Sequence, residues 1–350
     1  MTKLIEPWIA LATARRFTGD GGISDSYLLE RLRRDLDSAV PRAEDLVAEA
    51  SGIARPGPVR WELIGRQRWV EANVRSMTTL MGPLADRVAR RLDAVPWPAR
   101  VAQRTAVSAE VGVLLGYVSR RVLGQYDLLV PEDDEGAASL YFVGPNLVET
   151  ERRFGFIPEE FTLWVAVHEV THRFQFEGVP WLRPHFLDLV HRYLGSMDMD
   201  VKSLTKRLGE AARKLMSRAV PVEERNPIYL LASAEQRALL DQIQALMAVV
   251  EGHGNFVMDT VGAAVIPSFK QMRHVFQRRR SQATFVQKAL NHAIGLEMKL
   301  RQYELGQQFC ESVVQRQGHP ALARLWDSPD RFPTMAELRT PELWLDRVAA

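Results

Sequence analysis

Residues 161–176 constrain the fold of this chain most, because they place three polar side chains inside an otherwise apolar segment. His168, Glu169 and His172 form an H-E-x-x-H motif. In a helix, residues four positions apart lie on one face, so the two histidines can present imidazole nitrogens to one zinc ion. Glu169 lies one residue from His168, where its carboxylate can reach a zinc-bound water without taking a coordination position, as a general base does.

Local signals predict that this segment is a buried helix. Pro158 followed by Glu159 and Glu160 is typical of a first helical turn, and Gly178 and Pro180 are typical of a helix end. An apolar stripe at helical spacing consists of Leu163, Val167, Val170 and Phe174. We therefore expect the histidines to point inward. Two interpretations follow: a metal site, which we favour, and core histidines that bond other buried groups.

A catalytic zinc ion normally has three protein ligands, so the motif requires one more. The best candidate is Glu251, in a long predicted helix that opens with a Ser233/Gln236 capping box. Glu251 lies at the edge of the apolar stripe of that helix, so its carboxylate is expected to point toward the core. His253 lies about 200° further around the helix, so the two side chains can hardly reach one ion together. A buried salt bridge from Glu251 to an arginine is the alternative.

The residues after Glu251 support a site at this position. Gly252 and Gly254 each cost a helix about 1 kcal/mol relative to alanine, which favours a neighbouring helix that passes very close. The H-E-x-x-H helix is the candidate for that neighbour. Asn255 and Asp259 are placed to hydrogen-bond a ligand histidine and so fix its tautomer.

The remaining segments predict a mainly helical α+β fold with a small β element. Helices are expected at residues 8–18, 26–49, 60–93, 100–123, 185–195 and 200–225, and a strand at residues 139–144. That strand could hold an extended substrate by strand addition, or it could be a short core strand. We expect an N-terminal helical layer at residues 1–100 and a metal-binding domain at residues 101–350, or one continuous domain over residues 1–350.

Composition argues against several classes of partner. The chain is 46% hydrophobic and 25% charged with a formal net charge of +2, so no nucleic-acid binding is expected. No run approaches the roughly 18 apolar residues of a membrane span, which predicts a cytoplasmic protein without membrane contact. The single cysteine, Cys310, excludes an intrachain disulfide and a multi-cysteine zinc site.

Three stretches carry a resemblance to a known family. They are His-Glu-Val-Thr-His-Arg-Phe-Gln-Phe from His168, Val-Glu-Gly-His-Gly-Asn-Phe-Val-Met-Asp around Glu251, and Gly-Leu-Glu-Met-Lys-Leu-Arg-Gln-Tyr-Glu-Leu-Gly from Gly295. With them the chain resembles the zincin-like metallopeptidase type 2 family, over most of its length from about residue 100 onward. The resemblance implies a zincin-like, mostly helical fold in which His168, Glu169, His172 and Glu251 match the family motifs. Some members of that family are associated with biosynthesis of a deazaflavin coenzyme.

We expect metal-assisted hydrolysis of an amide bond in a peptide or small amide substrate. Zn²⁺ held by the two motif histidines and Glu251 would lower the pKa of its water toward about 7, and Glu169 would pass the proton to the leaving amine. Tyr303 and Arg301 are candidate catalytic donors to the oxyanion, followed by His253. The alternative is a catalytically inactive zincin-like scaffold or binding protein.

Overall fold

The computed structural model describes residues 4–19, 26–82, 84–85, 96–129, 139–196, 232–281 and 296–349, except the side chains of residues 277, 279–281, 296–303 and 349. The elements up to the sheet are α1 (Pro7–Thr18), α2 (Tyr27–Ser51), β1 (Trp61–Ile64), α3 (Arg66–Leu80), α5 (Trp97–Ser119), β2 (Gly124–Tyr126) and β3 (Leu140–Val143). The longer helices that follow are α6 (Gly144–Phe154), α7 (Pro158–Gly178), α8 (Leu182–Ser196), α11 (Ala234–Val265), α12 (Phe269–Ser281) and α14 (Leu296–Gln317). The C-terminal part contains α15 (His319–Ala323), α16 (Met335–Arg339) and α17 (Pro341–Ala349), with 3-10 turns at Arg324–Trp326 and Pro329–Arg331. This arrangement confirms the predicted fold class, mainly helical with a small β element.

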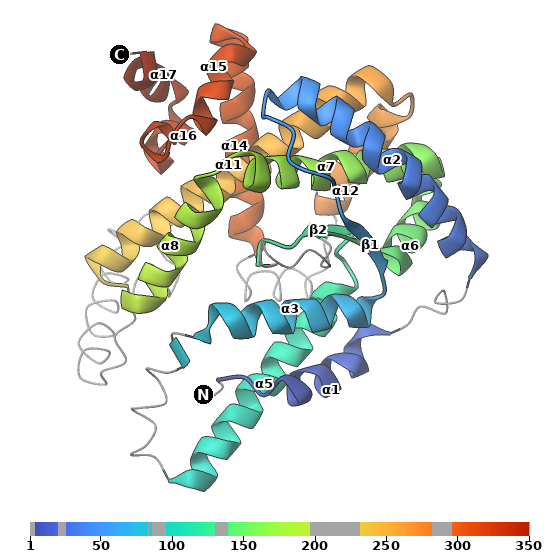
Figure 1. Ribbon diagram of the computed structural model, residues 1–350, viewed down its shortest axis with the longest axis vertical. Coiled ribbons are helices and arrows are strands. Elements are labelled where there is room, and N and C mark those ends of the chain that lie inside the picture. The colour runs from blue at the N-terminus through green and yellow to red at the C-terminus, as the bar shows by residue number, and fades with distance from the viewer. Residues whose placement is uncertain are drawn as a thin grey trace.

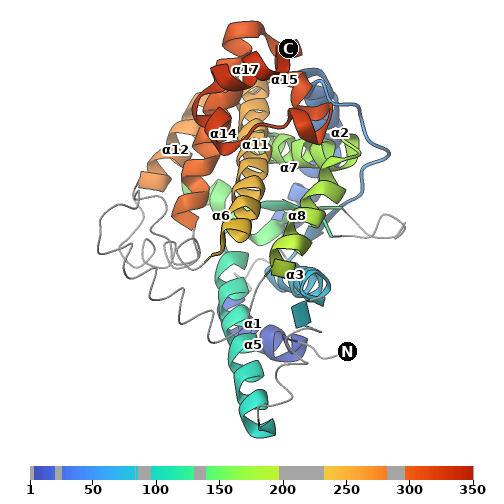
Figure 2. The same ribbon diagram turned by 90° about the vertical axis from the view of Figure 1, so that its left-hand side faces the viewer.

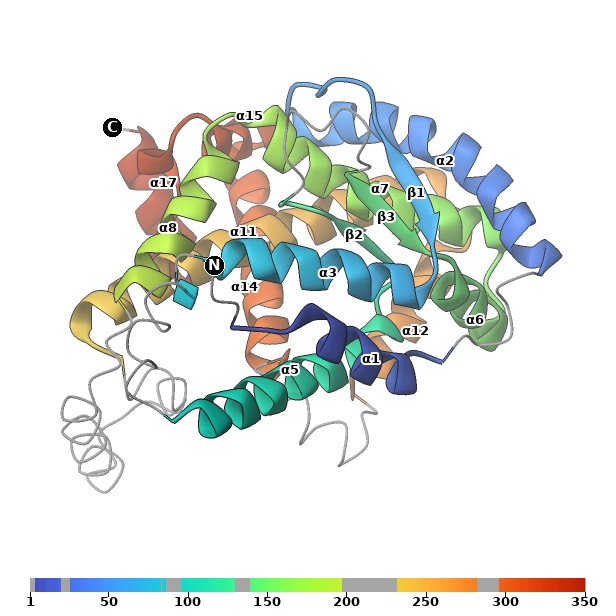
Figure 3. The same cartoon turned by 60° about the horizontal axis from the view of Figure 1, so that its bottom comes forward.

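The three strands form one small sheet in the order β1-β3-β2, with β1 parallel and β2 antiparallel to β3. Successive side chains of the central strand β3 point to opposite faces of the sheet. Leu140 and Phe142 belong to the main hydrophobic core, whereas Tyr141 and Val143 belong to a second one. The sheet therefore lies between two helical layers, with α3 on one side and α7 on the other (Figure 3).

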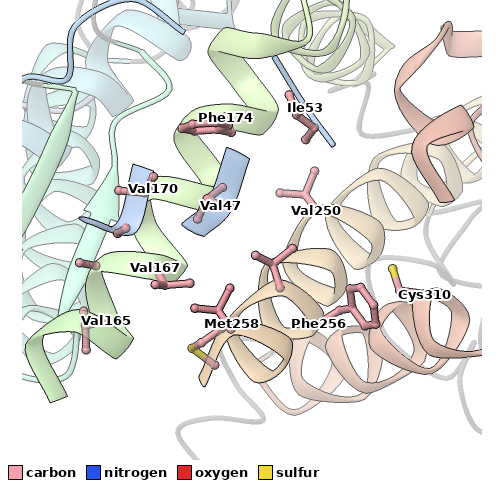
Figure 4. Close-up of a cluster of buried hydrophobic side chains, with 14 of the residues drawn as sticks. Val47, Ile53, Val165, Val167, Val170, Phe174, Val250, Phe256, Met258 and Cys310 are labelled. Carbon is pink, nitrogen blue, oxygen red and sulfur yellow. The ribbon is translucent and has the colours of Figure 1, made fainter. Parts of the chain in front are cut away.

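Helix α7 runs through the middle of the main core (Figure 1). It packs against α2 and α11, and α11 in turn packs along α14, as the turned view in Figure 2 also shows. Every residue from 161 to 176 except His168 is buried. Figure 4 shows Val170 and Phe174 of α7 near Val47 of α2 and Val250 of α11. Burial of an apolar side chain of this size contributes about 1.5–3 kcal/mol, so the motif helix is firmly held on both sides.

The helix ends agree with the sequence signals. The motif helix begins at Pro158, has Glu159 and Glu160 in its first turn, and includes Gly178 as its last residue. In the capping box of α11, the Ser233 side chain accepts from the Gln236 N–H and the Gln236 side chain accepts from the Ser233 N–H. Both predicted helix starts are therefore confirmed.

The prediction of a helix over residues 60–93 is wrong at its start. Residues Trp61–Ile64 form the strand β1, and the helix α3 begins only at Arg66. Trp61 pairs with Leu140, a residue far along the chain, so the strand depends on a partner that local periodicity does not reveal. The predicted helix at residues 200–225 lies outside the described residues.

The predicted strand at residues 139–144 is confirmed as β3, but it is the central strand of the sheet. Because it has a neighbour on each side, it offers no edge for strand addition. The predicted boundary at residue 100 stays a prediction: α1 and α3 contribute to the second core and α2 to the main one. Within the described ranges, no helix combines the length and the apolarity needed to cross a membrane.

Candidate metal centre

His168 and His172 lie one turn apart on α7, with their imidazole Nε2 atoms 3.2 Å apart. Two ligand atoms bound about 2.0–2.1 Å from a tetrahedral zinc ion lie about 3.3 Å apart, so this separation fits two ligands of one ion. The Glu251 Oε2 atom is 3.7 Å from the His172 Nε2 atom. In the part of the chain that the structure describes, these three side chains form a group whose ligand atoms lie within 4.8 Å of one another. Two imidazoles and a carboxylate are a donor set that suits zinc.

Helix α11 brings Glu251 to the histidines at a point where a glycine faces α7. A Cβ atom on Gly254 would lie 3.2 Å from the His172 Cε1 atom and 3.5 Å from the His168 Cε1 atom. A contact of 3.2 Å is tighter than most real Cβ contacts, so the rings fill the space that a side chain would need. The predicted close passage of the motif helix is confirmed at Gly254.

Gly252 faces a different helix. A Cβ atom there would overlap the backbone of Gly306 in α14, so the prediction that α7 is its neighbour is wrong. Residues 252 and 254 are about 200° apart around a helix, and this is why two close neighbours can be accommodated within one turn. Through these two glycines, α11 is fixed between α7 and α14 (Figure 2).

Glu169 is buried between α7 and the strand β2. Its carboxylate accepts a hydrogen bond from the backbone N–H of Tyr126. A Cβ atom on Gly124 would lie 2.6 Å from the Glu169 Cγ atom, so a glycine is needed where β2 passes. Burial, together with the nearby Glu251 carboxylate, raises the pKa of Glu169 to about 8, although the Tyr126 N–H opposes the shift. Burial thus favours the protonated form of this carboxyl group relative to that of an exposed glutamate.

Gln175 is a site residue that sequence reasoning missed. Its Oε1 atom lies 2.9 Å from the His172 Nδ1 atom. Its Nε2 atom donates to the Val250 carbonyl oxygen at 2.9 Å and lies 3.0 Å from the His253 Nδ1 atom. The sequence contained a signal for this contact, because a residue three positions after His172 lies on the same face of the helix.

The remaining predicted site residues are Asn255, Asp259 and Tyr303. Asn255 is half-buried on α11, and its contact with a ligand histidine stays a prediction. The Asp259 Oδ2 atom is 3.0 Å from the Gln307 Nε2 atom and 3.1 Å from the Arg273 guanidinium, and its role toward the histidines also stays a prediction. The side chain of Tyr303, the predicted oxyanion donor, lies outside the described residues.

Two of three comparisons with known proteins found a match. A family model described as zincin-like metallopeptidase matches residues 5–345. The chain is also similar to a crystal structure from Chloroflexus aurantiacus described as a "putative hydrolase with a novel fold", with 31% identity, 99% of each chain covered and a TM-score of 0.73. No curated protein matches the chain.

Proposed function

Because the chain belongs to the zincin-like metallopeptidase family, we propose that it is a zinc-dependent hydrolase that cleaves an amide bond in a peptide. The observation that carries this proposal is the convergence of ligand atoms from His168, His172 and Glu251 within 4.8 Å of one another. The buried carboxyl group of Glu169 follows the first ligand directly in the sequence and provides an acid–base group at the same place.

Each side chain of the site has one task in this proposal. His168, His172 and Glu251 would hold the zinc ion, which would supply Lewis acidity to the site. Glu169 accepts a proton from the attacking water and delivers it to the leaving nitrogen. The water oxygen bonds to the carbonyl carbon and the C–N bond breaks, which gives a carboxylic acid and an amine. The buried position of Glu169, directly after His168 in the sequence, supports both proton transfers.

The position of β2 supports an extended peptide as the substrate. This strand lies at the edge of the described sheet, and the Leu123 carbonyl and the Asp127 N–H both bond to the β3 side. Backbone groups alternate in direction along an antiparallel strand, so those of Gly124 and Tyr126 face away from β3. The Tyr126 N–H already meets Glu169 there. A peptide that pairs with this edge would have its backbone beside Glu169.

The finer assignments belong to the same proposal. Tyr303 is the proposed donor to the oxyanion, and Asn255 and Asp259 are proposed to orient ligand histidines. The cytoplasm is the proposed location, because a chain with one cysteine forms no intrachain disulfide and so does not depend on an oxidising compartment.

Metal content and hydrolysis test the proposal together. We would purify wild type, Glu251→Ala and Glu169→Gln without added metal, measure zinc by elemental analysis, and assay a peptide library. About one zinc per chain is expected in wild type and in Glu169→Gln, and clearly less in Glu251→Ala. Hydrolysis is expected only in wild type, because Glu169→Gln retains the ligands and lacks the proton acceptor.

Matched controls are available on the same helices. Glu235→Ala changes an exposed glutamate of α11, and Glu159→Gln changes an exposed one of α7, so both should retain zinc and activity. Absence of zinc from wild type even after soaking with the metal would contradict the proposal. Zinc without hydrolysis of any library peptide would favour the inactive scaffold or binding protein.

A further inference from the structure

Gln175 contacts the ligand residue His172 but is not itself one of the three candidate metal ligands. Its side chain has 0% exposure, so no solvent can replace the partners of its amide group. The amide lies between His172 of α7 and two residues of α11, Val250 and His253. We propose that Gln175 is a positioning residue that fixes the tautomer of His172 and the placement of Glu251, and thereby sets the zinc affinity. This inference rests on the proposed metal site.

The orientation of the amide group follows from the chemistry of its partners. The Val250 carbonyl oxygen can only accept a hydrogen bond, so the Gln175 atom 2.9 Å away must be the NH₂ nitrogen. The amide oxygen then faces the His172 Nδ1 atom at 2.9 Å. An amide oxygen only accepts, so the His172 Nδ1 atom carries the proton.

The proton on Nδ1 leaves the Nε2 lone pair of neutral His172 available. That nitrogen is the one that lies 3.2 Å from His168 Nε2 and 3.7 Å from Glu251 Oε2. A histidine binds a metal through an unprotonated nitrogen, so Gln175 selects the tautomer that aims a lone pair into the site. The opposite tautomer would place a proton there.

His253 completes the arrangement. The second N–H of the Gln175 amide points to the His253 Nδ1 atom at 3.0 Å, which must therefore act as an acceptor. The His253 ring is itself held edge-on to Trp326, with ring centroids 5.0 Å apart. Both N–H groups of the amide and its oxygen therefore have partners, and exchanging the oxygen and the nitrogen would place the amide oxygen against the Val250 carbonyl oxygen.

The same amide joins the two helices that carry the ligands. Val250 directly precedes Glu251, so the hydrogen bond to its carbonyl fixes the backbone of α11 next to the third ligand. His172 and Gln175 lie on α7, which carries the other two ligands. One buried side chain thus connects the tautomer of one ligand to the position of another.

Two substitutions separate the two effects. Gln175→Leu removes every hydrogen bond of the amide at similar size, so we expect loss of the fixed tautomer and a zinc affinity lower by about 10–100-fold. Gln175→Glu retains an oxygen that accepts from His172 Nδ1 but has no N–H for Val250. It should retain the tautomer and lose less affinity than Gln175→Leu. Gln242→Leu, on the exposed face of α11, is the control and should match wild type.

The tautomer is measured in the metal-free protein by ¹⁵N NMR of the imidazole rings. The signals of His172 are identified as those that disappear in the His172→Asn variant. Zinc affinity is measured by competition with a chelator. The expected result is an Nδ1-protonated His172 in wild type and Gln175→Glu, and a mixture of tautomers in Gln175→Leu. An Nε2-protonated His172 in wild type would overturn the inference without any variant. A folded Gln175→Leu protein with the wild-type tautomer and affinity would overturn it as well.

These readouts are independent of catalysis. Wild type that binds zinc with the expected tautomer and cleaves no peptide would leave the role of Gln175 intact and contradict only the proposed hydrolysis.

Discussion

Gly254 leaves the space that the imidazole rings of His168 and His172 occupy. The distance of 3.2 Å from its hypothetical Cβ atom to His172 Cε1 requires the ring to move by a few tenths of an ångström. The backbone of α11 is not obstructed there, because the atoms nearest that Cβ position belong to the two rings. The identity of residue 254 therefore affects ligand geometry more directly than it affects the fold.

This difference gives a prediction for Gly254→Ala. Alanine favours the helix by about 1 kcal/mol, which offsets the crowding of the rings, so the free energy of unfolding should change little. Zinc affinity should fall, because His172 is displaced from its place beside Glu251. Urea unfolding and chelator competition measure the two quantities. A variant with wild-type zinc affinity would show that the rings adjust without consequence for the site.

A second prediction concerns Glu337, whose side chain completes the capping box of α16 with the N-cap residue Thr334. Burial opposes its ionisation, but Arg347 and the Thr334 N–H and hydroxyl bond its carboxylate, and the net effect holds its pKa below the usual 4.5. A lowered pKa in the folded state means that the ionised form stabilises the fold above the unfolded pKa. That stabilisation is lost as the pH falls through the folded pKa.

The comparison is between wild type and Glu337→Gln in urea, at about pH 7 and about pH 3. Wild type should have the larger free energy of unfolding at the higher pH, and its advantage over Glu337→Gln should be smaller at the lower pH. Glu342→Gln is the control, because Glu342 forms an exposed ion pair with Arg316 that contributes little. A difference that is independent of pH would contradict the assigned role of the Glu337 carboxylate.

The helices α11 and α14 cross with their backbones in close contact. A Cβ atom on Gly306 would overlap the carbonyl group of Ala248, and one on Gly252 would overlap Gly306 in return. Backbone atoms on both sides leave no flexible side chain to yield. The position of α14 against α11 therefore depends on Gly252 and Gly306, which face each other. Helix α14 also contributes Phe309 and Cys310 to the main core.

Gly306→Ala is accordingly expected to destabilise the protein, in contrast with Gly254→Ala. Separation of the helices disturbs a packed core at about 1–3 kcal/mol, more than the roughly 1 kcal/mol by which alanine favours a helix. Urea unfolding of the two variants side by side measures this contrast. Equal stabilities would contradict the close crossing.

Across the whole molecule, the sheet couples the two hydrophobic cores. Leu140 and Phe142 of β3 belong to one core, and Tyr141 and Val143, which alternate with them along the strand, belong to the other. Displacement of β3 would therefore remove buried side chains from both cores at once. Of the two domain arrangements expected from the sequence, we propose the continuous one over residues 1–350.

A single unfolding transition is the expected consequence. Far-UV circular dichroism and tryptophan fluorescence should report one midpoint, because both cores lose β3 together. Tyr141→Ala, a change within the second core, should lower that midpoint in both signals alike. Two separated midpoints would instead support independent units divided near residue 100.

The sequence alone determined the parts of this protein that depend on neighbours a few residues apart. The motif helix, its start at Pro158 and the Ser233 capping box follow from spacings of three and four residues within one helix. Glu251 followed from the number of ligands that zinc requires, and the structure places it with the two histidines.

Several packing partners of these helices and strands became visible only in the folded structure. These are β2 rather than β3 as the strand at the edge beside Glu169, α14 as the neighbour of Gly252, and Val250 and His253 as the partners of Gln175. The strand β1 was missed for the same reason. Each of these features joins segments distant along the chain. Local periodicity states which face of an element is apolar, but the partner of that face is selected by packing of the whole molecule.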